Sequence, residues 1–207
     1  YVKIVGLKIE KGLVSASVVN KGFRQTELVD SFSQPFATDA ELVEILKAKS
    51  LDWADAKIIS SIPGRFFTQR TVAFPFADRK RVEKALPFEI EDVVPFALED
   101  VVLDHLTLGT GNAEKGKETP TLGMMLPKAL LRQHLDLLAS AGIDPQVIVP
   151  SYIGLYAVFR MMKVEGCAVL VCGRDLCVAC SDAVRGLRSF SDSAPTGGLR
   201  HTIHAIE

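Results

Sequence analysis

Four cysteines lie close together near the C-terminal end of the chain. They are Cys167, Cys172, Cys177 and Cys180. Zinc binds thiolates when their spacing lets them converge on one centre, but this spacing matches no standard zinc pattern. The two host segments have the composition of strands, whose alternation directs successive side chains to opposite faces. Because cysteine is also a small and frequently buried hydrophobe, we interpret all four as packing residues and expect no metal.

Six carboxylates flank Pro95 and form a second group with catalytic potential. They are Glu89, Glu91, Asp92, Glu99, Asp100 and Asp104. Acid–base catalysis requires two groups with separated pKa values in one pocket, whereas a run of acids around a proline is typical of a solvated face. His201 and His204 lie one helical turn apart, without a partner ligand at a readable spacing. No G-x-S-x-G, H-E-x-x-H or Walker A motif is present, so we expect no enzymatic activity.

A third group is basic, and it lies just upstream of these acids, at Arg79, Lys80, Arg81 and Lys84. A helix with bases first and acids last opposes its own dipole, which indicates that its charges serve another purpose. Interleaved phenylalanines would suit single-stranded nucleic acid, but the net charge of −1 disfavours it. We predict contact with an acidic protein surface; an ordinary solvated helix is the alternative. The predicted contact residues are Arg79, Arg81, Lys84, Glu89 and Glu91.

The composition is that of a folded protein. The 207 residues are 48% hydrophobic and 24% charged, which suffices for one large domain or two small ones. No apolar run approaches the roughly 20 residues that span a bilayer, and no signal peptide is present. Since the chain begins at Tyr1 within a predicted strand, we expect it to be a fragment.

Periodicity and turn residues predict mixed strands and helices. The predicted strands are Val2–Ile9, Leu13–Val19, Phe23–Ser33, Lys57–Ile62, Phe66–Phe74, Asp100–Leu108, Thr121–Leu126, Pro145–Val149, Cys167–Cys172, Leu176–Ser181 and Val184–Ser189. Helices are predicted after Thr38, over Asp78–Val94, from Pro127 as the first helical residue, after Ser151 and over Leu199–Ile206. This order indicates an α/β protein with three parts: residues 1–75, an inserted subdomain at 76–150, and a last part at 151–207.

The helix Asp78–Val94 carries the predicted contact residues. Its apolar positions repeat at helical spacing at Val82, Leu86 and Ile90, so one face should be buried. Asp78 is a suitable N-cap, and Pro87 inside the pattern removes one helical hydrogen bond. The opposite, charged face is therefore expected to meet solvent or a partner.

Four stretches resemble one protein family. They are SIPGRFFTQRTVAFP (61–75), RKRVEKALPFEIEDVVPFALEDVVLDH (79–105), LPKALLRQHLDLLASAGIDPQVI (126–148) and VLVCGRDLCVAC (169–180). The chain resembles the cytoplasmic actin-like domain of type II secretion protein L and its relative, type IV pilus assembly protein M. The resemblance implies an actin-like, ribonuclease H-like mixed-sheet fold with an inserted small α/β subdomain.

The same resemblance implies a role in assembly at the cytoplasmic side of the bacterial inner membrane. The implied partners are the N-terminal domain of the secretion ATPase and the inner-membrane platform proteins; a homodimer is compatible with it. The alternative is an ATP-binding, actin-like pilus assembly protein that binds the N-terminal peptide of a membrane partner.

The nucleotide site implied by the fold departs from its pattern. Actin-like ATPases use two glycine hairpins, each with an aspartate that positions Mg²⁺ through water. The first hairpin would precede Tyr1, and the aspartate expected in the second falls on Val171. We therefore expect a degenerate nucleotide site and no cofactor. ATP with Mg²⁺ is the cofactor that the fold would otherwise bind. The residues of this site would be Gly173, Arg174, Gly197 and Gly198.

Overall fold

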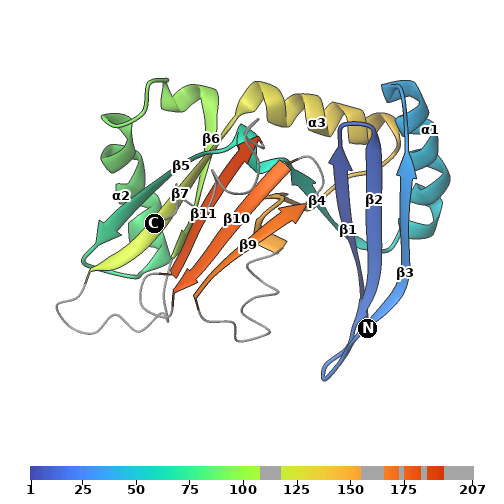
Figure 1. Ribbon diagram of the computed structural model, residues 1–207, viewed down its shortest axis with the longest axis horizontal. Coiled ribbons are helices and arrows are strands. Elements are labelled where there is room, and N and C mark those ends of the chain that lie inside the picture. Colours follow the sequence, from blue (N-terminus) through green and yellow to red (C-terminus); the bar gives the residue numbers. More distant parts are fainter. Residues whose placement is uncertain (108–117, 155–165, 173–174, 183–185, 194–207) are drawn as a thin grey trace. The chain divides into compact units, whose positions relative to one another are not determined.

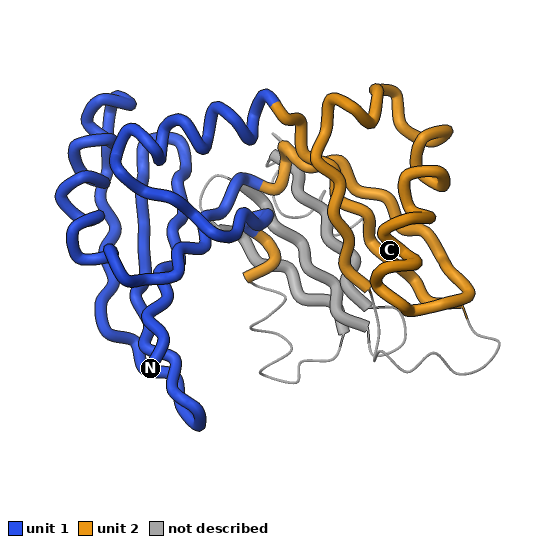
Figure 2. The backbone as a smooth tube through the Cα atoms, turned by 180° about the vertical axis from the view of Figure 1, so that it is seen from behind, with its two compact units in different colours: residues 1–63, 129–151 blue, residues 64–128, 152–207 orange. Residues whose placement is uncertain are grey.

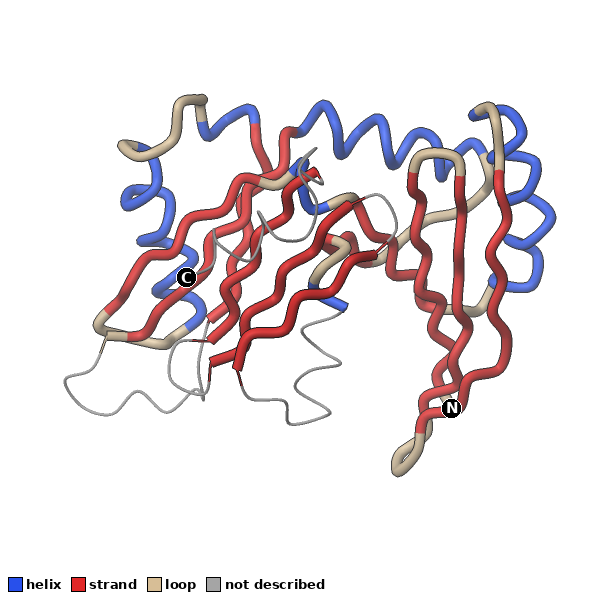
Figure 3. Tube along the Cα trace, in the orientation of Figure 1, coloured by secondary structure: helices blue, strands red, loops and turns tan. Residues whose placement is uncertain are grey.

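The computed structural model describes residues 1–107, 118–154, 166–172, 175–182 and 186–193, with side chains described as far as Gly154. The chain divides into two compact units (Figures 1 and 2). Unit 1 comprises Tyr1–Pro63 and Ala129–Ser151, and unit 2 comprises Gly64–Lys128 and Tyr152–Glu207. Each unit contains its own sheet and its own helix-covered core (Figure 3).

Unit 1 is built on a five-stranded sheet in the order β3-β2-β1-β4-β8. Its strands are β1 (Val2–Glu10), β2 (Leu13–Lys21), β3 (Thr26–Pro35), β4 (Lys57–Ile62) and β8 (Val147–Pro150). The first three strands are antiparallel, while β1 pairs with β4 and β4 with β8 in parallel. Two antiparallel hairpins followed by two parallel crossovers give the ribonuclease H-like sheet that the sequence led us to expect.

Two helices supply the core of unit 1. They are α1 (Asp39–Ser50), which a short 3₁₀ turn at Leu51–Trp53 extends, and α3 (Lys128–Ser140). Leu42 and Leu46 of α1 and Leu138 of α3 are all at most 1% exposed, and they belong to one core with the inward side chains of β1 and β2. Gly142 follows α3 with a φ of 73°, a left-handed conformation that ends the helix.

One polar pair links α3 to the sheet of unit 1. Ser60 of β4 is fully buried, and its Oγ lies 2.9 Å from Nε2 of His134 on α3. Burial lowers the pKa of His134, because removing water disfavours the charged imidazolium. The pair satisfies two polar groups that would otherwise face an apolar interior.

Unit 2 contains a three-stranded antiparallel sheet in the order β5-β7-β6. Its strands are β5 (Thr68–Phe74), β6 (Val101–Thr107) and β7 (Thr119–Pro127), and its helix is α2 (Arg79–Glu91). Single 3₁₀ turns precede β5 at Gly64–Phe66 and β6 at Leu98–Asp100. Val82, Leu86 and Ile90 of α2 form one core with Phe74, Val101 and Met125 of the sheet.

Gly123 allows α2 to approach this sheet closely. A Cβ atom added at Gly123 would lie 2.6 Å from Cδ1 of Ile90. Because a larger residue there would have to displace Ile90, the glycine in the central strand β7 sets the packing distance of the helix.

A second three-stranded antiparallel sheet of unit 2 has the order β11-β10-β9. Its strands are β9 (Gly166–Cys172), β10 (Asp175–Asp182) and β11 (Gly186–Ser193). Cys167 lies opposite Cys180 in the register of β9 and β10. The side chains of all four cysteines lie outside the described part, so their assignment as packing residues stays a prediction.

The two units divide the chain differently from the three segments expected from the sequence. The segment 129–151 belongs to unit 1, whereas the sequence grouped it with residues 76–150. The reason is the pairing of β8 with β4, which adds β8 to the five-stranded sheet. Parallel pairing across such a separation leaves no local signal in the sequence.

Several element boundaries also differ from expectation, among them those of α2 and α3. Helix α2 ends at Glu91 rather than Val94, and Val93 is 52% exposed. Pro95 disfavours helical geometry at the residue before it, which accounts for the earlier end. Pro127 ends β7 instead of opening α3, which begins at Lys128.

Candidate protein-docking site on helix α2

Helix α2 is held in place by its cap and its buried face. The Oδ1 atom of Asp78 accepts a hydrogen bond of 3.0 Å from the backbone N–H of Arg81, confirming the predicted N-cap. Val82, Leu86 and Ile90 are at most 1% exposed. Since these three residues recur every four positions, they fix which side of the helix faces the sheet.

The opposite side of α2 faces solvent. Arg81, Lys84, Phe88 and Glu91 are exposed and recur at intervals of three and four, so they lie on one stripe. We call these four residues the outward stripe. Phe88 is 75% exposed at the middle of this stripe. An exposed aromatic ring between charged side chains has the composition of a protein-binding hot spot.

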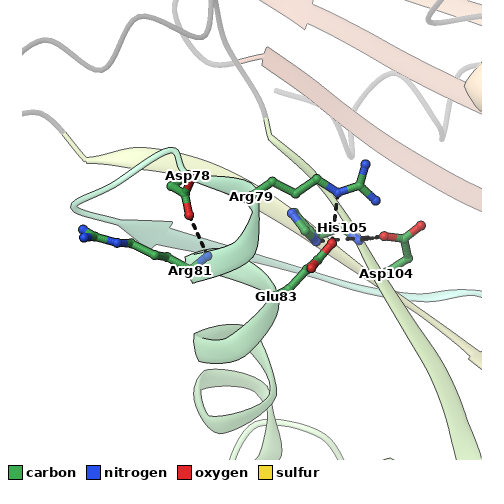
Figure 4. A network of polar contacts seen from close by, with 6 residues as sticks. All are labelled: Asp78, Arg79, Arg81, Glu83, Asp104 and His105. Carbon is green, nitrogen blue, oxygen red and sulfur yellow. Dashed lines mark hydrogen bonds and ion pairs between the residues drawn. The ribbon is translucent and has the colours of Figure 1, made fainter.

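The first turn of α2 also has a lateral ion pair. Nε of Arg79 lies 3.0 Å from Oε1 of Glu83, at the i,i+4 spacing (Figure 4). In Figure 4 Arg79 and Glu83 extend toward the side of the helix where Asp104 and His105 of β6 lie, and Arg81 extends the other way. Arg79 is therefore on a flank of α2 and not on its outward stripe.

The structure thus separates the five contact residues expected from the sequence. Arg81, Lys84 and Glu91 share the outward stripe. Arg79 is on one flank, and helical geometry places Glu89 on the other. Phe88 is the residue that sequence reasoning missed. Its position could have indicated this exposure, because Phe88 lies midway between the buried residues Leu86 and Ile90 and therefore on the opposite side of the helix.

Two of the aromatic residues near this helix pack in the core of unit 2. Phe74 is 4% exposed, and its ring stacks on that of Phe76 with 5.4 Å between centroids. Phe66, at the start of the unit, is 37% exposed and lies 4.7 Å from the guanidinium carbon of Arg65. Phe74 is therefore not available to stack on bases, and the expectation that the chain binds no nucleic acid stays a prediction.

The predicted nucleotide residues Gly173, Arg174, Gly197 and Gly198 lie outside the described residues, as do His201 and His204. Val171 belongs to β9, directly before the position of the predicted glycine turn. Among the helices in the described part of the chain, none is long and apolar enough to cross a membrane.

Solved structures similar to this chain define its fold. The PilM–PilN type IV pilus biogenesis complex matches with a TM-score of 0.72 and 18% identity, covering 93% of this chain and 62% of that one. The cytoplasmic domain of EpsL, an inner membrane component of the type II secretion system of Vibrio cholerae, matches with a TM-score of 0.63 and 18% identity. That match covers 92% of this chain and 71% of the cytoplasmic-domain chain.

A third similar structure is a Bacteroides thetaiotaomicron protein with an actin-like ATPase fold and unknown function. Its TM-score is 0.56 at 12% identity, over 99% of this chain and 74% of that one. No protein-family model and no curated protein matches the chain. The chain is therefore a protein of the actin-like fold, as the ribonuclease H-like sheet of unit 1 indicates. Its similarity to the EpsL and PilM structures confirms the resemblance seen in the sequence.

Proposed function

We propose that the chain is a cytoplasmic scaffold domain of a type II secretion inner-membrane platform, that it docks the N-terminal domain of the secretion ATPase, and that it has no ATPase activity of its own. The observation that carries the proposal is the outward stripe of α2. The helix is anchored by a fully buried face, yet its outward stripe presents Phe88 and three charged residues to solvent. The fold shared with the EpsL cytoplasmic domain supports a place in a secretion platform.

The docking surface consists of the outward stripe, with Arg79 and Glu89 at its flanks. Basic residues in the first half of α2 accelerate encounter with an acidic partner, because charge complementarity mainly raises the association rate. Phe88 supplies the apolar contact that slows dissociation. Other inner-membrane platform proteins are further partners of the same scaffold, on the cytoplasmic side of the membrane.

The alternative function is an ATP-binding, actin-like pilus assembly protein that binds the N-terminal peptide of a membrane partner. The similarity to the PilM–PilN complex favours it. Val171 speaks against it, because an apolar side chain at the position of the expected aspartate does not hold hydrated Mg²⁺.

Docking is tested with purified secretion ATPase N-terminal domain in a kinetic binding assay. The double variant Arg81→Glu/Lys84→Glu should bind with a lower association rate, and the loss should be larger at low salt. Arg132→Glu, an exposed reversal on α3, is the matched control and should bind normally. If the double variant remains folded by circular dichroism and binds with unchanged kinetics, the docking surface is not on α2.

Nucleotide chemistry is tested by isothermal titration with Mg-ATP and by a phosphate-release assay. The proposal predicts no turnover. Micromolar binding with steady phosphate release would replace the scaffold proposal with the alternative.

A further inference from the structure

The turn between β2 and β3 exposes an aromatic and a cationic side chain next to each other. The backbone N–H of Gly22 donates a hydrogen bond of 2.9 Å to the carbonyl oxygen of Gln25, which closes the turn around Phe23 and Arg24. Phe23 is fully exposed, and Arg24 is exposed beside it. Figures 1 and 2 show that this turn projects beyond the ends of the unit 1 helices. The phenylalanine is therefore open to contact from outside the unit.

A row of apolar side chains crosses the sheet next to this turn. Ile4 is opposite Val19, and Val19 is opposite Leu28, so the three lie side by side on one face of β1, β2 and β3. Their chain neighbours Val5 and Val18 alternate to the other face, where they belong to the core with α1 and α3. Leu28 is 61% exposed. The apolar row thus lies on the sheet face opposite the helices.

Two bases share the face of the apolar row. Lys57 is opposite Ile4 in the pairing of β1 with β4, and Lys21 follows Val19 by two residues along β2. Within the described ranges, no ion pair involves Lys21, Arg24 or Lys57. We call this part of unit 1 the hairpin surface; it consists of Val19, Lys21, Phe23, Arg24, Leu28 and Lys57.

The two acids of β3 lie on the other face of the sheet. Asp30 is opposite Val18, which belongs to the core beneath the helices. Glu27 is opposite Asn20, two residues along β2 from Val18 and therefore on the same face as Val18. The strand register thus sorts the charges at this end of the sheet, with bases beside the apolar row and acids on the helix-covered face.

Apolar and basic side chains with an aromatic ring at the tip are complementary to the interface of a bilayer that contains anionic phospholipids. Apolar side chains enter the boundary between headgroups and acyl chains, while lysine and arginine stay at the phosphates. An acidic protein would also attract the bases, but it would have to supply a pocket for the projecting ring. A lipid interface accepts the ring at any point.

We propose that the hairpin surface binds the surface of a membrane that contains anionic phospholipids, with the Phe23 ring inserted below the headgroups and Lys21, Arg24 and Lys57 at the phosphates. Such a chain lies on the membrane and does not span it. Each base near an anionic leaflet strengthens binding about fivefold, so the contact is reversible and sensitive to salt. It uses unit 1, whereas the proposed docking uses α2 of unit 2.

Co-sedimentation of the chain with vesicles tests the charges of the hairpin surface. The chain should sediment with vesicles of equal parts phosphatidylglycerol and phosphatidylcholine, should remain in solution with phosphatidylcholine alone, and should be released by salt. Lys21→Glu/Arg24→Glu should weaken binding about twenty-fivefold or more, since two attractive charges become repulsive. Arg132→Glu, an exposed reversal on α3, is the matched control and should bind like the unchanged chain.

Absence of binding to the anionic vesicles would overturn the proposal and leave the hairpin surface to a protein partner. Equal binding by the double variant and the unchanged chain, with both folded by circular dichroism, would also overturn it.

Insertion of the ring is tested at Phe23 itself. Phe23→Ala should weaken vesicle binding about tenfold, whereas Phe88→Ala, the same change at an exposed ring of α2, should leave it unchanged. The emission of Phe23→Trp should shift to shorter wavelength on anionic vesicles and be quenched by brominated acyl chains. The native Trp53 is 3% exposed, so it contributes a constant background. Vesicle binding without this quenching would show that the chain meets the membrane elsewhere.

The same variants separate this inference from the proposed docking. Phe23→Ala should bind the ATPase N-terminal domain normally, and Arg81→Glu/Lys84→Glu should bind the vesicles normally. If Arg81→Glu/Lys84→Glu loses the vesicles while Lys21→Glu/Arg24→Glu keeps them, the membrane contact is on α2 and the hairpin surface is wrong. Failure of ATPase binding alone would leave the membrane contact standing.

Discussion

Helices α1 and α2 are of nearly equal length, and each packs on a sheet, but their charges are arranged in opposite orders. In α1 the acids Asp39 and Glu41 occupy the first turn, and the bases Lys47 and Lys49 occupy the last. In α2 the first turn is basic, and the acids lie at the end. The helix dipole favours the order in α1 and opposes the order in α2.

The two helices also differ in what their exposed residues do. The N-cap Thr38 of α1 accepts a hydrogen bond of 3.2 Å from the N–H of Glu41, and the Glu41 carboxylate accepts one of 2.8 Å from the N–H of Ala37. The outward face of α2 instead exposes Phe88. The polar surface of α1 stabilises its own helix, whereas the order of the charges along α2 does not, as the proposed docking role requires. The buried face of α2 holds the helix on its sheet, whereas its exposed face contributes little to the stability of the helix.

The largest expected effects are on the buried faces, where the two helices should behave alike. Leu46→Ala in α1 and Leu86→Ala in α2 each empty a fully buried site. Each should lower the free energy of unfolding by about 2–5 kcal/mol, through lost burial and the cavity left behind. Urea denaturation followed by circular dichroism measures both. A loss below about 1 kcal/mol at Leu86 would mean that α2 is not anchored as described.

The N-caps should have a smaller and again similar effect. Thr38→Ala and Asp78→Ala each remove an oxygen that accepts a first-turn N–H. Each should cost about 1 kcal/mol of unfolding free energy, measured in the same way. Thr38→Ser and Asp78→Asn keep the acceptor oxygen and are the matched controls. They should retain most of the unfolding free energy that the alanine variants lose. Equal loss in the controls would refute a capping role.

The half-buried His134 makes the stability of unit 1 depend on pH. Because burial lowers the pKa of His134 in the folded state, the unfolded chain binds a proton more readily. This contribution to stability is complete above the ordinary pKa of 6.5 and decreases as the pH falls toward the lowered value. Denaturation between pH 7.5 and 5 should show this decrease, and His134→Gln should remove it. If His134→Gln shows the same pH dependence of stability as the unchanged chain, that dependence arises from other groups.

Local signals in the sequence predicted much of the fold. Thr38 with Glu41 and Asp78 before a basic turn mark the starts of α1 and α2, because each cap acts within four residues. Val82, Leu86 and Ile90 predicted the buried face of α2 through their period. The pairing of β8 with β4 was not predictable, because parallel strands brought together from distant segments share no turn.

The candidate site was only partly predictable, for the same physical reason. The charges of α2 were visible in the sequence, and the period of Val82, Leu86 and Ile90 indicated which side of the helix leaves them exposed. The close approach of Ile90 to Gly123 of β7 was not visible, because the two residues are distant in sequence. Phe88 was missed because only charged residues of this helix were considered as contacts.

The most direct test of the central claim, that α2 is charged for docking and not for its own stability, is the free energy of unfolding of Lys80→Glu/Arg81→Glu. At a concentration where the chain is monomeric, this double variant should be more stable than the unchanged chain by about 0.3–1 kcal/mol, because its first turn then agrees with the helix dipole. The mirror change in α1, Asp39→Lys/Glu41→Lys, should instead be destabilising. A double variant in α2 that is less stable than the unchanged chain would show that these bases support the fold, and would contradict the account.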